Sequence, residues 1–264
     1  MLPDIEVLKV MVCEAAREEL LPRFSHVLRS RKQDGSFVTE ADLAMQDRLR
    51  RELAVRWPDI PLLGEEMTVD EQTALLADGS RPLWCLDPLD GTTNFAAGVP
   101  FFAVSLALLV EGRVALGVIV DPVREECFSA VAGGGASLGD MPLHAEGETS
   151  ELAQSVALID FKRLPVALRE RLTRGTPFAS QRNFGSCALE WCWLAAGRGQ
   201  LLLHGGERLW DFAAGTLILD EAGGASCTLD GEPVFRPGID KRSVIAAGSA
   251  ALFDAWRGWV MTRS

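Results

Sequence analysis

The sequence lacks the features that would place it in a membrane or along a nucleic acid. Its longest apolar run, Phe101–Val110, is far shorter than the roughly 18 residues that a membrane span needs. Acidic residues interrupt the apolar positions of residues 1–20, so this segment has no signal-peptide core. There is no basic run of five or more residues, and the formal net charge is −11. Because a phosphate backbone needs a basic stripe, we expect neither a nucleic-acid partner nor a membrane partner.

Cysteine and histidine are scarce and show no ligand spacing. The six cysteines include no C-x-x-C pair, and the three histidines lack H-E-x-x-H spacing. Scattered cysteines of this kind are typical of reduced, buried thiols in a cytoplasmic protein rather than of a disulfide framework. The spacing therefore predicts a cytoplasmic location and gives no reason to expect a metal site built from nitrogen and sulfur.

The composition is that of a packed globular protein, with 48% apolar and 24% charged residues. A chain of 264 residues can form one large domain or two halves that share an interface. The pattern changes near residue 145, and there is no repeat or long linker. We therefore predict an N-terminal α+β half, residues 1–144, and a C-terminal α/β half, residues 145–264, packed together.

Hydrophobic periodicity and capping signals predict the main elements. Helices are expected over residues 4–29, 39–57, 186–196 (capped by Ser186) and 210–222, and strands over 83–86, 101–110, 114–120, 155–159, 201–204 and 243–247. Asp34-Gly35 has the signature of a hairpin turn, and Glu-Gly-Arg at 111–113 joins two strands in the same way.

The most informative segment is WCLDPLDGTTNF, residues 84–95. Leu83–Leu86 predicts a buried strand that leads into a rigid loop, since Pro88 fixes φ and Gly91 allows an unusual backbone angle. A lone D-x-x-D would be explained well enough by an ordinary Asx turn. The string D-P-[LIV]-D-G-T, however, has a chance frequency on the order of 10⁻⁷ per position, so chance does not explain it.

A loop of this kind can direct the carboxylates of Asp87 and Asp90 and the carbonyl of Leu89 to one side. These are hard oxygen ligands, which suit Mg²⁺ better than Zn²⁺. The backbone amides of Gly91 and Thr92 could then face a phosphate oxygen.

Three other acidic segments have both a structural and a functional interpretation. Glu65 and Glu66 follow an apolar run, where they could be a solvated loop or could supply a metal ligand. Asp42 could interact with free amides of a helix start capped by Thr39. Asp211 lies in the first turn of a predicted helix, where the macrodipole favours an acid in any case.

In this order and at these separations the motifs resemble those of the inositol monophosphatase family. The matching segments are VTEAD at 38–42, GEE at 64–66, DPLDGTTNF at 87–95, DPVREECFSAVAGGGA at 121–136, WDFAAG at 210–215 and LDEAGG at 219–224. The resemblance covers nearly the whole chain and implies an α/β fold: an α+β layered sandwich with two sheets in an αβαβα arrangement. It also implies a Mg²⁺-dependent, lithium-sensitive phosphatase that forms a homodimer.

The resemblance further implies a set of metal ligands. Glu65, Asp87 and the carbonyl of Leu89 would hold one Mg²⁺, and Asp87, Asp90 and Asp211 would hold a second. Glu65 would also share a weaker third site through water and so take part in catalysis. The cofactor is therefore predicted to be two or three Mg²⁺ ions per site.

The same resemblance assigns roles around the phosphate. Thr92 would help to activate the attacking water, with Asp42 hydrogen-bonded to it as orienter or base. Glu66 and Lys32 are further candidates, Lys32 because it lies in a hairpin that closes over the metals in relatives. The substrate-binding set is predicted to be Gly91, Thr92, Asp90, His204 and Asp211.

Substrate choice is less well defined by the sequence. His204 stands where inositol-specific relatives carry an acid that binds sugar hydroxyls, so an inositol phosphate becomes doubtful; a local hydrogen bond at a strand end explains this histidine equally well. Arg182, Arg208 and Lys162 are candidate contacts for a second anionic group, as in a bisphosphate or a nucleotide.

Two hypotheses about function follow. The first is a phosphomonoesterase that hydrolyses a small phosphorylated metabolite by in-line attack of a metal-activated water, without a covalent intermediate. The metabolite would be a sugar, polyol or nucleotide phosphate, such as inositol phosphate, fructose bisphosphate, histidinol phosphate or 3′-phosphoadenosine 5′-phosphate. The alternative is a non-catalytic phosphate-metabolite-binding or regulatory protein that retains the fold.

Overall fold

The computed structural model describes residues 2–24, 30–31, 37–79, 81–145 and 151–262. Two sheets form its framework. The seven-stranded sheet contains, in spatial order, β3 (Leu62–Gly64), β4 (Leu83–Asp90), β5 (Ala103–Val110), β6 (Arg113–Asp121), β7 (Glu126–Val131), β8 (Gly135–Leu138) and β9 (Met141–Pro142). The five-stranded sheet contains, in spatial order, β11 (Ser180–Arg182), β10 (Val156–Asp160), β12 (Leu201–Glu207), β14 (Arg242–Ala247) and β13 (Ala225–Cys227).

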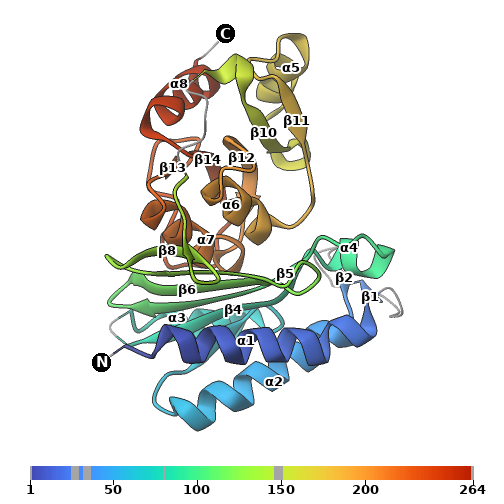
Figure 1. The fold of residues 1–264 in the computed structure, drawn as a ribbon, viewed down its shortest axis with the longest axis vertical. Helices are drawn as coiled ribbons and strands as arrows, with labels where there is room; N and C mark the ends of the chain where they lie inside the picture. Colours follow the sequence, from blue (N-terminus) through green and yellow to red (C-terminus); the bar gives the residue numbers. More distant parts are fainter. Residues whose placement is uncertain (1, 25–29, 32–36, 80, 146–150, 263–264) are drawn as a thin grey trace.

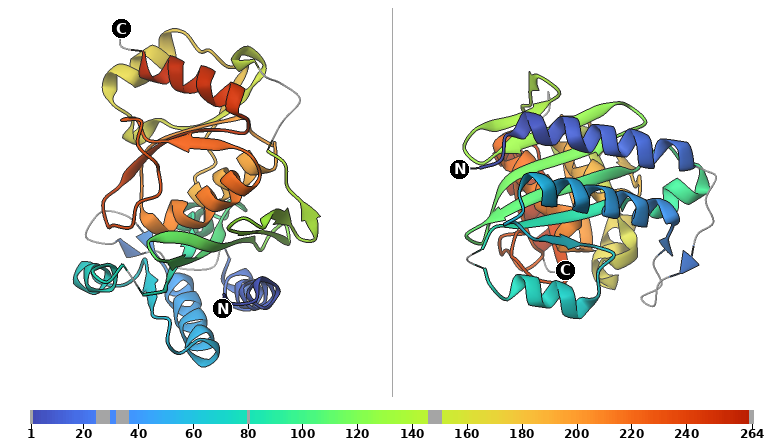
Figure 2. Two further views of the ribbon diagram at one scale, coloured as in Figure 1. Left: turned by 90° about the vertical axis from the view of Figure 1, so that its left-hand side faces the viewer. Right: turned by 90° about the horizontal axis from the view of Figure 1, so that it is seen from below.

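Helices form the remaining layers. They are α1 (Ile5–Glu19), α2 (Glu40–Arg56), α3 (Val69–Leu76), α4 (Thr92–Ala97), α5 (Val166–Arg174), α6 (Cys187–Ala195), α7 (Leu209–Glu221) and α8 (Ala250–Met261), with 3-10 turns at Leu21–Arg23, Leu152–Gln154 and Phe161–Arg163. In Figure 1, α1 and α2 cover the outer face of the larger sheet, α6 and α7 lie between the sheets, and α5 and α8 cover the far side of the smaller sheet. Figure 2 shows the same layering from two further sides. The predicted αβαβα sandwich is confirmed.

Period-two alternation in the strands explains this layering. In β4, Trp84 and Leu86 pack with the residues of α1 and α2, whereas Leu83 and Cys85 belong to the core between the sheets. Successive side chains of a strand point to opposite faces, so a fully apolar strand needs cover on both sides. The continuous apolar runs read from the sequence are therefore strands buried between two helix layers.

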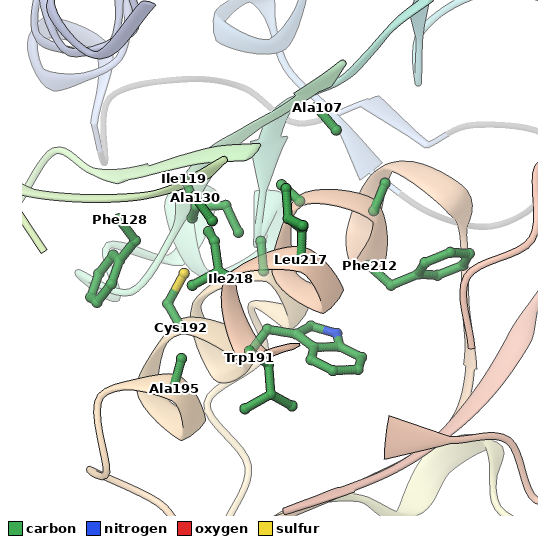
Figure 3. Close-up of a cluster of buried hydrophobic side chains, with 14 of the residues drawn as sticks. Ala107, Ile119, Phe128, Ala130, Trp191, Cys192, Ala195, Phe212, Leu217 and Ile218 are labelled. Atoms are coloured by element: carbon green, nitrogen blue, oxygen red, sulfur yellow. The ribbon is translucent and has the colours of Figure 1, made fainter. Parts of the chain in front are cut away.

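The layer between the sheets is closely packed (Figure 3). Ile218 of α7 and Cys192 of α6 belong to the same core as Ile119 of β6. A Cβ added at Gly215 of α7 would lie 2.6 Å from Cβ of Trp191 in α6, closer than real Cβ contacts. Only glycine at this position allows α6 and α7 to approach so closely.

Two predicted elements require correction. The first helix ends at Glu19 and continues as the 3-10 turn Leu21–Arg23, because Pro22 has no amide proton to extend an α-helix. Residues 87–90, expected as a loop, belong to β4: Asp87 pairs with Ser105 and Asp90 with Ala103, and the register shifts between them. The motif thus lies on an irregular strand paired to β5.

Other expectations about the elements agree with the structure. Strands β5 and β6 form the predicted antiparallel hairpin, and α2 and α7 begin and end within one or two residues of their predicted bounds. The predicted Asp34-Gly35 turn lies outside the described residues, but the flanking β1 (Ser30–Arg31) and β2 (Phe37–Val38) pair antiparallel. All six cysteines are free thiols. Among the described residues, no helix combines the length and the apolar character that a bilayer crossing requires.

Candidate metal and active site

Three aspartates converge where β4 meets the N-terminus of α7. One carboxylate oxygen from each of Asp87, Asp90 and Asp211 lies within 4.8 Å of the other two. Residues three apart in a regular strand would point to opposite faces, so the register shift between Asp87 and Asp90 allows both carboxylates to share one side. We refer to Asp87, Asp90 and Asp211 as the acidic site.

Asp90 also joins the two halves of the chain. Its Oδ2 accepts hydrogen bonds from the Ser186 hydroxyl at 2.5 Å and from the Ala188 amide at 2.7 Å. Ser186 occupies the N-cap position of α6, as predicted, but its side chain makes no capping bond to the helix. The expected cap is therefore wrong in its chemistry, because the Asp90 carboxylate, from a strand distant in sequence, takes both the hydroxyl and a free helix amide.

Asp211 is oriented by the start of α7. Its Oδ2 accepts from the amide of Arg208 at 2.7 Å, which makes Asp211 the third-position acid of a capping box. The Ser105 hydroxyl of β5 donates to the carbonyl of Trp210 at 3.1 Å and ties this helix start to the larger sheet. Asp87 is oriented locally, since its Oδ1 accepts from the amide of Leu89 at 3.0 Å.

A chain of hydrogen bonds joins the start of α2 to the motif. Asp42 accepts from the amide and the hydroxyl of Thr39 through Oδ2, at 2.7 and 2.6 Å. Its other oxygen lies 3.1 Å from Oγ1 of Thr92, and that hydroxyl is also 3.0 Å from the carbonyl oxygen of Leu89. The capping interpretation of Asp42 and the functional one are therefore compatible, because the two carboxylate oxygens serve different partners.

The acidic pair after β3 is held by two glutamines. Gln72 of α3 donates from Nε2 to the carbonyls of Gly64 and Glu65, at 3.0 and 3.2 Å. Gln46 of α2 accepts from the amide of Glu66 at 3.2 Å. Strand β3 pairs parallel with β4, and Gly64 lies opposite Leu86. Glu65, the residue after β3, therefore lies beside the start of the motif at Asp87. Neither glutamine carries a signal in the sequence that would mark this role.

Burial and mutual repulsion shape the protonation of these acids. Burial, followed by the charges of Glu65, Asp90 and Asp211, raises the pKa of Asp87 well above its usual range. Burial raises the pKa of Asp211 to about 8 and that of Asp90 to about 6, with hydrogen bonds from Ser186 and Ala188 opposing the shift at Asp90. Burial also raises the pKa of Asp42. Such crowding of carboxylates is relieved by a bound cation.

The donor set fits a hard divalent cation. The acidic site offers carboxylate oxygens within 4.8 Å of one another, and no nitrogen or sulfur ligand belongs to that group among the described residues. The carbonyl of Leu89 lies in the same strand segment, with the Thr92 hydroxyl 3.0 Å away. Oxygen-only ligation of this kind suits Mg²⁺.

His204 lies at a different cluster from the acidic site. Its Nδ1 accepts from the amide of Gly206 at 3.1 Å, and its Nε2 lies 3.2 Å from Oδ2 of Asp160 and 3.9 Å from Sγ of Cys187. Glu207 Oε1 lies 3.7 Å from Nδ1. Sulfur, nitrogen and oxygen ligands therefore do meet in this fold, against the expectation from cysteine and histidine spacing, because β12 and α6 bring distant residues together.

The basic residues that could contact a substrate differ in exposure and in hydrogen-bond partners. Arg182 and Lys162 are exposed, and the guanidinium of Arg208 donates to the carbonyl of Ile239 at 2.5 Å. Arg163, which sequence reasoning missed, donates to the carbonyl of Gly206 at 2.8 Å, and its charge opposes the rise in the pKa of Asp211. Lys32 lies outside the described residues.

Comparison with known proteins agrees with the motifs. The model of the inositol monophosphatase family matches residues 3–257. A protein named Nus factor SuhB from Pasteurella multocida is 38% identical over 205 residues, 76% of this chain and 74% of that protein. An inositol-1-monophosphatase from Mesorhizobium japonicum is 34% identical over 225 residues, 82% of this chain and 80% of that protein.

The fold leads to the same group of proteins. The crystal structure of the extragenic suppressor protein suhB from Bartonella henselae superposes with a TM-score of 0.84 at 28% identity, covering 98% of each chain. The match runs through both sheets and therefore includes the strand and the helix that carry the acidic site. The chain belongs to the inositol monophosphatase family.

Proposed function

We propose that this protein is a Mg²⁺-dependent phosphomonoesterase that hydrolyses a small phosphorylated metabolite. The observation that carries the proposal is the meeting of Asp87, Asp90 and Asp211 within 4.8 Å. The hydrogen-bonded pair of Thr92 and Asp42 lies on the same motif, 3.1 Å between oxygens. A phosphate monoester dianion repels an attacking oxygen nucleophile, so a cluster of acids alone would be a poor phosphatase and needs cations.

Bound Mg²⁺ would neutralise the ester charge, help to generate the nucleophile and stabilise the leaving oxygen. Glu65, Asp87 and the Leu89 carbonyl are proposed to hold one ion, and Asp87, Asp90 and Asp211 a second. Glu65 is proposed to serve a weaker third ion through water. The donor chemistry of these groups supports the assignment, because all of them are oxygen atoms.

The residues around the metals have distinct proposed roles. Thr92 orients the attacking water through its hydroxyl, and Asp42 orients Thr92 and takes up the proton. The hydrogen bonds from Thr39 to Asp42, at 2.7 and 2.6 Å, leave Asp42 Oδ1 directed at Thr92, which supports this role. The amides of Gly91 and Thr92 are proposed to bind the phosphate. No covalent intermediate is required.

The substrate is proposed to be a sugar, polyol or nucleotide phosphate. Inositol phosphate is one candidate, since the Mesorhizobium japonicum relative is named an inositol-1-monophosphatase. His204, Asp90 and Asp211 are proposed to face the substrate. A bisphosphate or nucleotide is a second candidate class, and Arg163 is better placed than Lys162 or Arg182 to meet a second anionic group, because its charge already acts on Asp211.

The test is phosphate release from a panel of phosphate esters by the purified full chain. We expect turnover with Mg²⁺, loss of turnover with EDTA, recovery on adding Mg²⁺ back, and inhibition by Li⁺. Asp90→Asn should lower kcat by roughly 10³-fold or more, since it removes a charged ligand. The matched control is Asp230→Asn, an exposed acid outside the acidic site, which should retain activity.

A trapped phosphoryl-enzyme, or full activity of Asp90→Asn with Mg²⁺ present, would contradict the mechanism. If the protein hydrolysed none of a broad panel of phosphate esters, the result would favour the second candidate, a non-catalytic binding or regulatory protein. The observation behind that candidate is that the Pasteurella multocida relative is named a Nus factor. The retention of Glu65, Asp87, Asp90, Thr92 and Asp211 in this chain favours catalysis, because a purely regulatory role does not need a full ligand set.

A cytoplasmic location, expected from the scattered cysteines, and a homodimer, expected from the family resemblance, remain predictions. Light scattering of the purified chain, whose monomer mass is 28.6 kDa, measures its oligomeric state directly.

A further inference from the structure

A second group of metal-ligating side chains lies in the C-terminal half of the molecule. Cys187 is the first residue of α6, His204 lies in β12, and Glu207 ends that strand. One ligand atom from each of the three lies within 4.8 Å of the other two. Thiolate, imidazole and carboxylate are the protein ligands of Zn²⁺, in contrast to the oxygen-only acidic site. We refer to these three residues as the Cys–His–Glu cluster.

The carboxylate of Glu207 is buried, and its two oxygens face different neighbours. The residue is 1% exposed, and its Oε2 accepts from Nε1 of Trp191 at 2.8 Å. Oε1 faces Nδ1 of His204 at 3.7 Å, which is too long for a hydrogen bond. Burying a carboxylate is costly unless it is paired, protonated or bound to a metal. The oxygen that does not accept from Trp191 is therefore directed into the cluster.

The imidazole of His204 is oriented as in many metal sites. Because a backbone amide can only donate, the bond from Gly206 to Nδ1 at 3.1 Å places the lone pair on Nδ1 and the proton on Nε2. Nε2 then donates to Oδ2 of Asp160 at 3.2 Å. Metal-binding histidines commonly donate their other ring N–H to a carboxylate in this way. The Nδ1 lone pair lies on the side of Glu207 Oε1, and a metal bound there would replace its hydrogen bond from the Gly206 amide. Cys187 Sγ lies on the Nε2 side of the ring, 3.9 Å from that nitrogen.

We propose that Cys187, His204 and Glu207 bind one Zn²⁺ ion, with Asp160 supporting His204 from behind. Three protein ligands would leave a fourth position open, as in zinc sites that bind water or a ligand. With Zn–S near 2.3 Å and Zn–N near 2.0 Å, tetrahedral ligand atoms lie roughly 3.5 Å apart, so the side chains close by about 1 Å. The thiol proton of Cys187 passes to solvent when the thiolate binds. The inference does not depend on the proposed phosphatase activity.

The test uses Co²⁺ and Zn²⁺ as probes of the purified full chain, stripped of metal and then held in excess Mg²⁺ so that oxygen ligands are occupied. We expect one equivalent of Co²⁺ to bind and to give a thiolate-to-cobalt charge-transfer band in the near ultraviolet. One equivalent of Zn²⁺ should displace it. The affinity for Zn²⁺ is measured by competition with a chromogenic chelator.

Four variants assign the ligands. Cys187→Ser should abolish the charge-transfer band, and Glu207→Gln, which keeps an acceptor for Trp191, should weaken Zn²⁺ binding roughly 100-fold or more. Asp160→Asn, which removes the charge that His204 Nε2 faces but keeps an oxygen acceptor for the Lys162 amide, should weaken it about 10-fold. Cys13→Ser, in a half-buried thiol of α1, is the matched control and should keep both the band and the affinity.

Loss of the band in Cys13→Ser, or Zn²⁺ binding of unchanged affinity in both Cys187→Ser and Glu207→Gln, would overturn the proposal, because the metal would then lie elsewhere. No binding of Zn²⁺ or Co²⁺ by the folded wild type would overturn it as well. Each readout is a spectrum or an affinity, so failure here is distinguishable from failure of the phosphatase assay.

Discussion

The acidic site and the Cys–His–Glu cluster meet at the start of α6, where Ser186 donates to Asp90 and Cys187 belongs to the cluster, yet the two differ in chemistry. The acidic site matches the family motifs residue for residue and offers only oxygen ligands. The Cys–His–Glu cluster offers sulfur and nitrogen as well, and His204 stands where the resemblance to inositol-specific relatives leads one to expect an acid. The ligand set that we propose for the phosphate chemistry is thus complete, whereas the residue at position 204 differs from the acid expected there.

Electrostatics separates the two regions further. In the acidic site, burial and neighbouring acids together raise the pKa of Asp87, Asp90 and Asp211. Beside the Cys–His–Glu cluster, the hydrogen bond from His204 lowers the pKa of Asp160. Burial also raises the pKa of Glu207 within the cluster. All three acids of the first region therefore have a raised pKa, whereas in the second region one acid has a raised pKa and another a lowered one.

The largest effect is expected from Thr92→Val, which acts on the phosphate chemistry alone. Valine keeps the shape of the side chain but removes the hydroxyl that lies 3.1 Å from Asp42. We expect kcat to fall by about 10²-fold or more while KM changes little, as for loss of a group that assists proton transfer. Steady-state kinetics at saturating Mg²⁺ measures both constants.

Thr92→Ser is the matched control, since it keeps the hydroxyl and should retain most of the activity. If Thr92→Val kept its kcat within a few-fold of wild type, the hydrogen bond to Asp42 would have no part in catalysis.

The second effect is a dependence of stability on pH that bound metal removes. The pKa of Asp211 rises from 3.8 to about 8 and that of Asp90 to about 6, mainly through burial. An acid with a higher pKa in the folded state holds its proton more tightly there, so the metal-free protein loses stability as pH rises from about 4 to 8. Saturating Mg²⁺ favours the ionised forms and should remove this loss.

Calorimetry in EDTA and in Mg²⁺, at pH 5 and pH 8, measures the difference. For a chain of this length each kcal/mol shifts Tm by about 2–4 °C, so the metal-free Tm should fall by several degrees between the two pH values. Asp211→Asn should flatten the metal-free curve. Parallel curves with and without Mg²⁺ would show that these acids are not where the cation binds.

Site residues could be predicted from the sequence where the residues that define them lie close together along the chain. Asp87, Asp90 and Thr92 lie in one short motif, and their carboxylates and hydroxyl could be assigned without coordinates. Asp211 could be assigned because its motif has its own helix start. The sequence predicts a loop at residues 87–90, because Pro88 and Gly91 are typical of loops. The pairing with β5 makes this segment an irregular strand, and that pairing has no local signal in the sequence.

Contacts between distant segments could not be read from the sequence. Ser186 and Asp90 are 96 residues apart, and a serine before an apolar helix predicts a cap for that helix, which is the simpler local outcome. The same holds for Cys187 and His204, 17 residues apart on different elements. Tertiary packing determines such contacts. The early end of α1, by contrast, could have been predicted, because Pro22 is a local signal for it.

The third effect concerns substrate choice. His204→Glu replaces the Nε2–H donor that faces Asp160 with an acceptor, beside an existing negative charge. We expect the ranking of kcat/KM across a panel of esters to shift by about tenfold toward polyol phosphates and away from doubly anionic substrates. His144→Glu, at an exposed histidine, is the control. An unchanged ranking would show that position 204 does not select the substrate.

The smallest effect is expected from Ser186→Ala, which touches both regions at once. Its hydroxyl donates to Asp90 at 2.5 Å, and the Ala188 amide, at 2.7 Å on the same oxygen, remains after the change. Loss of one hydrogen bond to a charged group is worth about 1.5–3 kcal/mol when nothing replaces it, and water or Mg²⁺ can replace part of it here. We therefore expect kcat to fall by only about three- to tenfold, with a higher Mg²⁺ concentration needed for half-maximal activity. Ser180→Ala, on β11, is the control. If Ser186→Ala left the Mg²⁺ requirement unchanged, the bridge between α6 and Asp90 would serve stability alone, and the two regions would act independently.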